Sequence, residues 1–153
     1  MTTLDAALAY IAKGWAPVPV PLRKKSPLVE DWQSLRISAE TAPRYFNGAP
    51  RNIGVILGEA SGSLCDIDLD CVEATRAAPF LLPPTAVFGH APSKRTSHYV
   101  YQTNLSATQE RGVQKFIGSD KHGLLELRTG AGGRAAQTVF PPSVHVSGEP
   151  IEW

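Results

Sequence analysis

Residues 65–70, CDIDLD, set three carboxylates among apolar side chains. Strict alternation of apolar and acidic positions is typical of a strand, because successive strand side chains point to opposite faces. The apolar members, beginning with Cys65, would face a core, and Asp66 and Asp68 would share the other face about 7 Å apart. Like charges crowded on one strand repel, and a buried carboxylate is costly unless a cation pairs with it. The run therefore predicts a strand with an apolar face and an acidic face.

Two interpretations of the acidic pair stay open from these residues alone. Solvated aspartates on the outer face of a hairpin would need no ligand. Alternatively, two carboxylates on so short a baseline can converge on one or two divalent ions about 4 Å apart, the arrangement used for in-line phosphoryl transfer. Asp70 follows on the same face, where the strand is expected to end, and we place it outside the site.

The amino-terminal third predicts a helix, an edge strand and a second, short helix. Thr2 and Asp5 form a capping-box start for the first helix. The prolines of WAPVPVP, residues 15–21, permit only an edge strand or an extended chain. Ser38 could cap a short helix that runs toward Phe46.

The rest of the chain alternates short strand and helix signals. NIGVILG, residues 52–58, reads as a buried strand, and we expect it to form a hairpin with residues 64–70. A helical turn or two is expected over 72–78, before PFLLPPT breaks regular structure. Further expected elements are strands at 97–102, 124–130 and 136–140, a short helix opened by Ser106 and Gln109, and an extended segment after 140. This order argues for an α+β or mixed α/β fold.

Composition limits the class of protein. The chain has 153 residues, 42% of them hydrophobic and 19% charged, which suits one globular domain. A net charge of +1 gives no general attraction to nucleic acid, so such binding would need local patches. Cys65 and Cys71 lack the paired spacing of a zinc site, and neither a signal peptide nor a bilayer-length apolar run is visible. We expect a soluble, cytoplasmic domain with reduced cysteines.

Glu126 offers a third acid. In LLELRTG, Glu126 and Arg128 share one strand face, while Leu125 and Leu127 pack on the other. They could be a same-face ion pair that contributes little to stability. They could also be a third metal ligand beside a guanidinium suited to phosphate.

SKRTSHYVYQ adds a basic segment. Thr96 and His98 share a strand face directly after Lys94 and Arg95. His98 could be a half-buried structural histidine. Beside two cations and a hydroxyl, it resembles one wall of a triphosphate pocket.

These stretches together resemble one family. NIGVILGEASGSLCDIDLD, SKRTSHYVY and ELRTGAGGRAAQTVFPPSVHVSGEPIEW are similar to the bifunctional DNA primase/polymerase (Prim-Pol) family of the archaeo-eukaryotic primase superfamily, which occurs in plasmid, phage and prophage replication proteins. The family has an acidic-x-acidic pair, a small-x-His motif and a third acid after a hydrophobic residue. Here these fall on Asp66 with Asp68, Thr96 with His98, and Leu125 with Glu126.

The resemblance implies a fold and an activity. The fold would be an RRM-like catalytic core with an amino-terminal α/β unit, mixed or antiparallel sheet and short helices. The activity would be template-directed nucleotidyl transfer by a two-metal mechanism on a DNA template and primer with nucleoside triphosphates. Residues 1–153 would form one catalytic domain, the amino-terminal part of a longer replication protein with a carboxy-terminal helicase or helical domain.

The resemblance also suggests residue roles. Asp66, Asp68 and Glu126 would bind Mg²⁺ or Mn²⁺, and His98 would contact the nucleotide's phosphates. To these we add further nucleotide-binding candidates, Lys94, Arg95, Thr96 and Arg128, and candidates for weak contact with the DNA backbone, Arg23, Lys24, Lys25 and Arg134. Two rival functions remain: a non-catalytic nucleic-acid- or nucleotide-binding module of the same fold, and a metal-dependent nuclease.

Overall fold

A computed structural model describes residues 1–105, 110–132 and 135–153. The elements follow in the order α1 (Thr3–Ala12), β1 (Ala16–Pro21), the 3₁₀ turn η1 (Trp32–Ser34), α2 (Ala42–Phe46), β2 (Arg51–Ile56), the 3₁₀ turn η2 (Glu59–Ser61), β3 (Leu64–Leu69), α3 (Val72–Leu81), β4 (Ala86–His90), β5 (Lys94–Gln102), β6 (Val113–Ile117), β7 (Gly123–Arg128), β8 (Gln137–Phe140), β9 (Ser143–Val144) and β10 (Pro150–Glu152). The expected α+β class, with antiparallel sheets and few helices, is confirmed. None of the helices in these ranges is long and apolar enough to cross a membrane.

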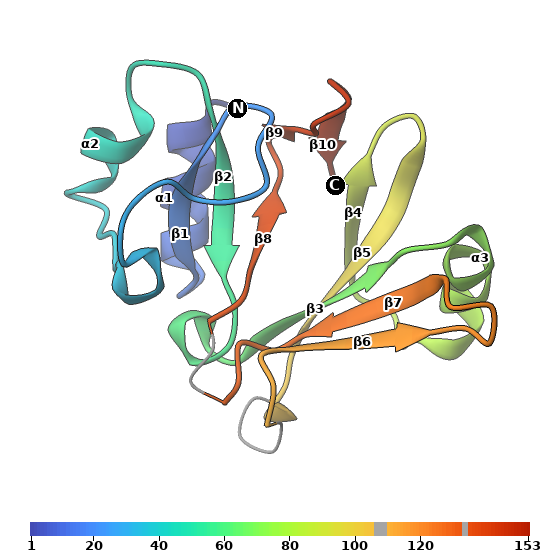
Figure 1. The fold of residues 1–153 in the computed structure, drawn as a ribbon. Coiled ribbons are helices and arrows are strands. Elements are labelled where there is room, and N and C mark those ends of the chain that lie inside the picture. Colours follow the sequence, from blue (N-terminus) through green and yellow to red (C-terminus); the bar gives the residue numbers. More distant parts are fainter. Residues whose placement is uncertain (106–109, 133–134) are drawn as a thin grey trace.

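The strands form two antiparallel sheets (Figure 1). The smaller sheet has the order β1-β2-β8, and the larger has the order β6-β7-β3-β5-β4-β10-β9. β3, the acidic strand, pairs with β5 on one side and with β7 on the other. Side chains from three neighbouring strands therefore meet on each face of β3.

The main core joins the two sheets. Ala6, Ala7 and Tyr10 of α1 belong to the same buried cluster as Phe88 of β4 and Phe140 of β8. The Phe88 and Phe140 rings lie 4.7 Å apart between centroids. This aromatic contact fixes the larger sheet against the smaller one, with β8 facing β3 and β5.

Several sequence-based expectations are confirmed. Thr2 and Asp5 make both hydrogen bonds of the capping box that begins α1. The proline-rich strand β1 lies at the edge of its sheet, where the missing N–H groups cost nothing in pairing. The strands expected near 97–102, 124–130 and 136–140 are β5, β7 and β8.

The expected hairpin between residues 52–58 and 64–70 is wrong. β2 pairs with β1 and β8, whereas β3 belongs to the other sheet, and a single bridge between Gly58 and Leu64 joins the two segments. Gly58 has φ of 77° and Gly62 has φ of 63°, so the chain turns out of the first sheet between them. Positive φ at both glycines changes the direction of the backbone. The apolar pattern of the flanking strands does not predict this change.

Other boundaries also differ from expectation. α2 begins after Thr41 rather than Ser38, because these two residues bond each other's backbone and side chains in a turn that precedes the helix. α3 continues through Pro79. β4 and β6 were not expected. The helix proposed from Ser106 and Gln109 lies outside the described residues.

Gly58 should tolerate no side chain. A Cβ there would lie 2.6 Å from the Thr129 carbonyl oxygen, whereas a Cβ on Gly14, which has nearly the same φ of 78°, would meet nothing within 4 Å. We predict that Gly58→Ala lowers the free energy of unfolding by about 3 kcal/mol and Gly14→Ala by about 1 kcal/mol. Urea denaturation measures both. Equal losses would show that the close approach at Gly58 does not matter.

Candidate active site

The strand register aligns the predicted site residues in two rows. In one row Asp68 lies opposite His98 of β5 and Glu126 of β7. In the next row Asp66 lies opposite Arg128 of β7. Directly opposite residues in an antiparallel sheet point to the same face, so these five side chains share one face.

Asp66 lies fully buried beneath this face. One of its oxygens accepts hydrogen bonds from His98 Nδ1 at 3.0 Å and from the Thr138 hydroxyl at 2.7 Å. Burial acts to raise the pKa of Asp66, but His98, Arg128 and Thr138 together outweigh burial and hold it below its ordinary value. Asp66 is therefore an ionised, fully desolvated carboxylate.

Arg128 bridges the other two acids. Its Nη2 atom donates to Asp68 at 2.6 Å and to Glu126 at 2.8 Å. Lys115 of β6 also pairs with Glu126 at 2.8 Å. Burial raises the pKa of Asp68 despite the neighbouring cations. For Glu126, hydrogen bonds and charges of Lys115 and Arg128 outweigh burial and lower the pKa.

His98 lies between the two aspartates. Its Nδ1 contacts Asp66 at 3.0 Å, and its Nε2 lies 3.6 Å from Asp68. The ring stacks on Phe88 of the core at 4.6 Å between centroids. Burial acts to lower the pKa of His98, but Asp66 and Asp68 raise it above its ordinary value. The two aspartates thus favour the protonated form of His98, and the stacked Phe88 ring holds the imidazole in place.

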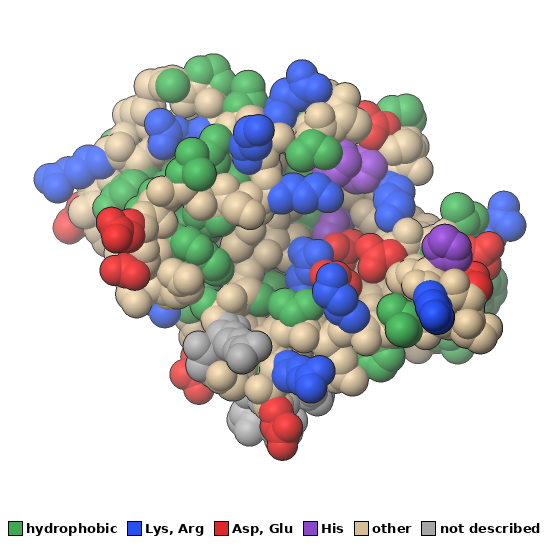
Figure 2. Space-filling model, in the orientation of Figure 1, with side chains coloured by type: hydrophobic (Ala, Val, Ile, Leu, Met, Phe, Trp, Pro, Cys, Tyr) green, Lys and Arg blue, Asp and Glu red, His purple; other side chains and the backbone are tan. Residues whose placement is uncertain are grey.

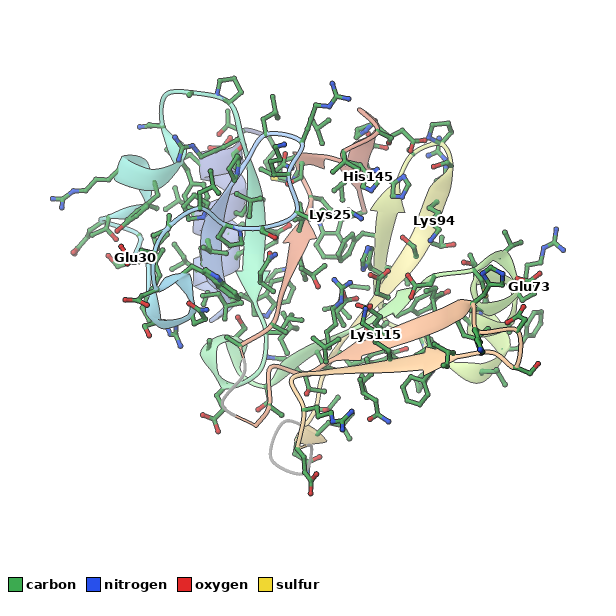
Figure 3. All side chains as sticks on the ribbon, viewed as in Figure 1. Lys25, Glu30, Glu73, Lys94, Lys115 and His145 are labelled. Carbon is green, nitrogen blue, oxygen red and sulfur yellow. The ribbon has the colours of Figure 1, made fainter. Side chains whose placement is uncertain are left out.

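A cavity opens over this face between the two sheets. Space-filling Figure 2 shows acidic and basic side chains gathered in the hollow, with histidine beside them. Its charged and histidine lining consists of Lys24, Lys25, Asp68, Asp70, His90, Lys94, His98, Arg128 and His145. Figure 3 shows Lys25, Lys94 and His145 around the opening. Positive side chains outnumber negative ones, so the lining favours an anionic guest.

The carboxy-terminal rim carries a second cluster. Glu149 accepts hydrogen bonds from Ser93, His90 and Ser147. Those from Ser93 and His90 lower its pKa to about 2. Burial, His90 and Lys25 lower the pKa of His145. The cluster thus combines a carboxylate with an imidazole that stays neutral at pH 7.

The predicted residues fall into separate groups. Asp66, Asp68, Glu126, His98 and Arg128 are in contact, and Lys94, Lys24 and Lys25 line the cavity. The exposed Arg95 and Thr96 are not among the described lining residues. Arg23 donates to the Val146 carbonyl at 3.1 Å, and Arg134 lies outside the described residues. The expectation that Asp70 lies outside the site is wrong, because Asp70 lines the same cavity as Asp68.

Sequence reasoning missed four residues of this region. Lys115 and Thr138 contact the acidic residues, and His90 and His145 line the cavity. Lys115 lies on β6, a strand that was not expected. Thr138 comes from the other sheet, so no spacing within the sequence relates it to Asp66. The polar Thr138 inside the apolar run AQTVF was the one available signal.

The acidic residues have the donor chemistry of a hard divalent cation. Asp66, Asp68 and Glu126 offer only oxygen, which Mg²⁺ and Mn²⁺ prefer. They do not bring three ligand atoms within 4.8 Å of one another; within the described ranges, only His90, His145 and Glu149 do so. The Arg128 Nη2 atom bonds Asp68 and Glu126 at once, as a bridging ion would. The residues thus fit a metal in the kind of ligand they offer but not in their present spacing, and an ion between Asp68 and Glu126 would have to replace the Arg128 guanidinium.

Thr138 should be a positioning residue for Asp66. Thr138→Val keeps the shape but leaves a buried carboxylate one hydrogen bond short, so we predict a loss of about 1–3 kcal/mol in the free energy of unfolding. Thr138→Ser keeps the hydroxyl and should lose about 1 kcal/mol or less. Urea denaturation in a metal chelator compares them. The role is refuted if the serine and valine variants lose equal stability.

His98 should contribute more to the stability of the metal-free protein at acidic than at alkaline pH. Its folded pKa lies above the unfolded value of about 6.5, so its contribution is complete below that pH and disappears as pH rises through the folded pKa. The stability advantage of wild type over His98→Gln should shrink between pH 6 and pH 9. Denaturation with a chelator tests this, with the exposed His122→Gln as control. A pH-independent advantage would contradict the assignment.

A search of curated proteins finds no match. The family model described as bifunctional DNA primase/polymerase, N-terminal (Prim-Pol), matches residues 7–153, which is nearly the whole chain. The chain therefore belongs to the Prim-Pol family of bifunctional DNA primase/polymerase N-terminal domains.

Proposed function

We propose that this chain catalyses template-directed nucleotidyl transfer, as a primase or DNA polymerase, on DNA with nucleoside triphosphates. Family membership implies primase/polymerase activity in general. The observation that carries the proposal is the register of β3, β5 and β7, which sets three carboxylates and His98 on one face beneath a basic cavity. Carboxylates and cations on one surface suit a reaction that needs both metal ions and phosphate binding.

Asp66, Asp68 and Glu126 would hold Mg²⁺ or Mn²⁺. In a two-metal site such ions activate the attacking 3′-hydroxyl and neutralise charge on the triphosphate. The buried Asp66 is fixed by His98 and Thr138, so it would enter that role already oriented. Arg128 would leave Asp68 and Glu126 and turn to phosphate, an anion that its guanidinium matches in geometry.

Lys94 and His98 would bind the triphosphate, and the cavity lining supports adding Lys24 and Lys25 to them. The sequence alone suggests that the two lysines contact the template backbone. Their position in the same cavity as Asp68 favours the nucleotide instead. Arg95 and Thr96 remain proposed nucleotide contacts, and Arg23 and Arg134 remain proposed contacts of the DNA backbone, with the salt dependence typical of phosphate binding.

We further propose the biological setting implied by the family. The chain would act in the cytoplasm as the amino-terminal catalytic domain of a longer phage, plasmid or prophage replication protein. A helicase or helical domain would follow it. The basic lining around the acidic face supports nucleotide binding over a nuclease that uses water as nucleophile.

Primer extension tests the proposed function. Wild type should extend a primer on a short DNA template with Mg²⁺ or Mn²⁺. Asp68→Asn together with Glu126→Gln should lower the rate by about 10³-fold or more, because it removes several kcal/mol of metal-dependent stabilisation. Glu40→Gln, at an exposed acid outside the described cavity lining, should retain activity.

Thermal melting in a chelator would show whether each variant folds. A folded wild type that binds a nucleoside triphosphate but extends nothing with either metal would favour the binding module. Cleavage of the template with the same metal dependence would favour the nuclease.

A further inference from the structure

We propose that His90, His145 and Glu149 form a second metal site, for a transition-metal dication such as Zn²⁺, apart from the carboxylates of β3 and β7. The three residues offer one ligand atom each, and these atoms all lie within 4.8 Å of one another. All three side chains are partly buried. Two imidazoles with one carboxylate form a donor set that suits Zn²⁺ and leaves coordination positions open.

The sheet fixes where these residues lie. His90 pairs with Ile151 of β10, and Val144 of β9 pairs with Pro150 of β10. His145 directly follows the paired Val144, and Glu149 directly precedes the paired Pro150. The His145 N–H donates to the Glu149 carbonyl at 2.8 Å, which closes the turn between them. Backbone pairing therefore presents all three side chains without help from a ligand.

Hydrogen bonds already orient the donor atoms. His90 Nδ1 lies 2.7 Å from Glu149 Oε2, and the Ser93 hydroxyl contacts both groups, at 3.1 and 2.8 Å. The Ser147 hydroxyl lies 2.9 Å from His145 Nδ1 and donates to Glu149 at 2.9 Å. The two serines lie outside the ligand set, and such outer contacts orient ligands in metal sites and tune affinity.

Metal binding would need one local change. The His90 and His145 rings are stacked, with centroids 4.0 Å apart and planes 2° from parallel. The nitrogen lone pairs lie in the ring planes, so one ring must turn before both can face one ion. His145 can turn more readily, because its side-chain hydrogen bonds are to Ser147 within the same turn.

The carboxylate in this cluster favours a bound metal ion over a bound anion. Lys25 and Lys94 line the same cavity and favour negative charge there. Glu149 is an ionised carboxylate at the centre of the cluster, and it would repel a phosphate placed between the histidines. His90 and His145 border the cavity, so the open positions of a bound metal would face its basic lining.

Visible absorption of Co²⁺, a spectroscopic substitute for Zn²⁺, tests the site without using activity. With millimolar Mg²⁺ present, wild type should bind one equivalent of Co²⁺ and release it to Zn²⁺. His145→Ala should weaken binding by about 100-fold or more, at least as much as the loss of an outer-shell partner. The exposed His122→Ala and the double variant Asp68→Asn, Glu126→Gln should bind as wild type does.

Three results would overturn the proposal. These are no Co²⁺ or Zn²⁺ binding at micromolar protein, binding that His145→Ala leaves unchanged, and binding lost in the Asp68, Glu126 double variant. Melting curves in a chelator show whether each variant folds. If His145→Ala does not fold, Co²⁺ binding is measured on Glu149→Gln instead. If folded Glu149→Gln binds as wild type does, the cluster is only a hydrogen-bonded link between the β4–β5 hairpin and the terminal strands.

Discussion

The buried negative charge of Asp66 constrains the rest of the structure. A fully buried carboxylate is costly, and two side chains from different sheets stabilise it, His98 of β5 and Thr138 of β8. His98 in turn needs the Phe88 ring behind it and Asp68 beside it. The pairing of one buried charge therefore links the two sheets, in addition to the aromatic contact between Phe88 and Phe140.

Arg128 extends the same principle to the surface of the site. Asp68 and Glu126 repel each other across β3 and β7, and the guanidinium between them removes that repulsion. We propose that a divalent ion neutralises Asp68 and Glu126 when nucleotide binds. The Arg128 guanidinium would then leave the two acids and bind the phosphates. In the metal-free arrangement the Arg128 guanidinium thus lies near the place where phosphate would bind.

Much of the site could be predicted from the sequence because strand alternation is strict. The period of CDIDLD assigned Asp66 and Asp68 to one face, and LLELRTG did the same for Glu126 and Arg128. The partners of β2 could not be predicted, since the positive φ at Gly58 and Gly62 sends β3 into another sheet. Thr138 and the cluster of His90, His145 and Glu149 depend on contacts between distant segments, which local pattern does not encode.

Anomalous diffraction from crystals soaked in Mn²⁺ with a non-hydrolysable nucleoside triphosphate would show whether the three acids bind metal. We predict Mn²⁺ peaks beside Asp66, Asp68 and Glu126, with the Arg128 guanidinium turned from the two acids toward phosphate. Nucleotide bound without a peak at these carboxylates, or with Arg128 still bridging Asp68 and Glu126, would refute the proposed metal site.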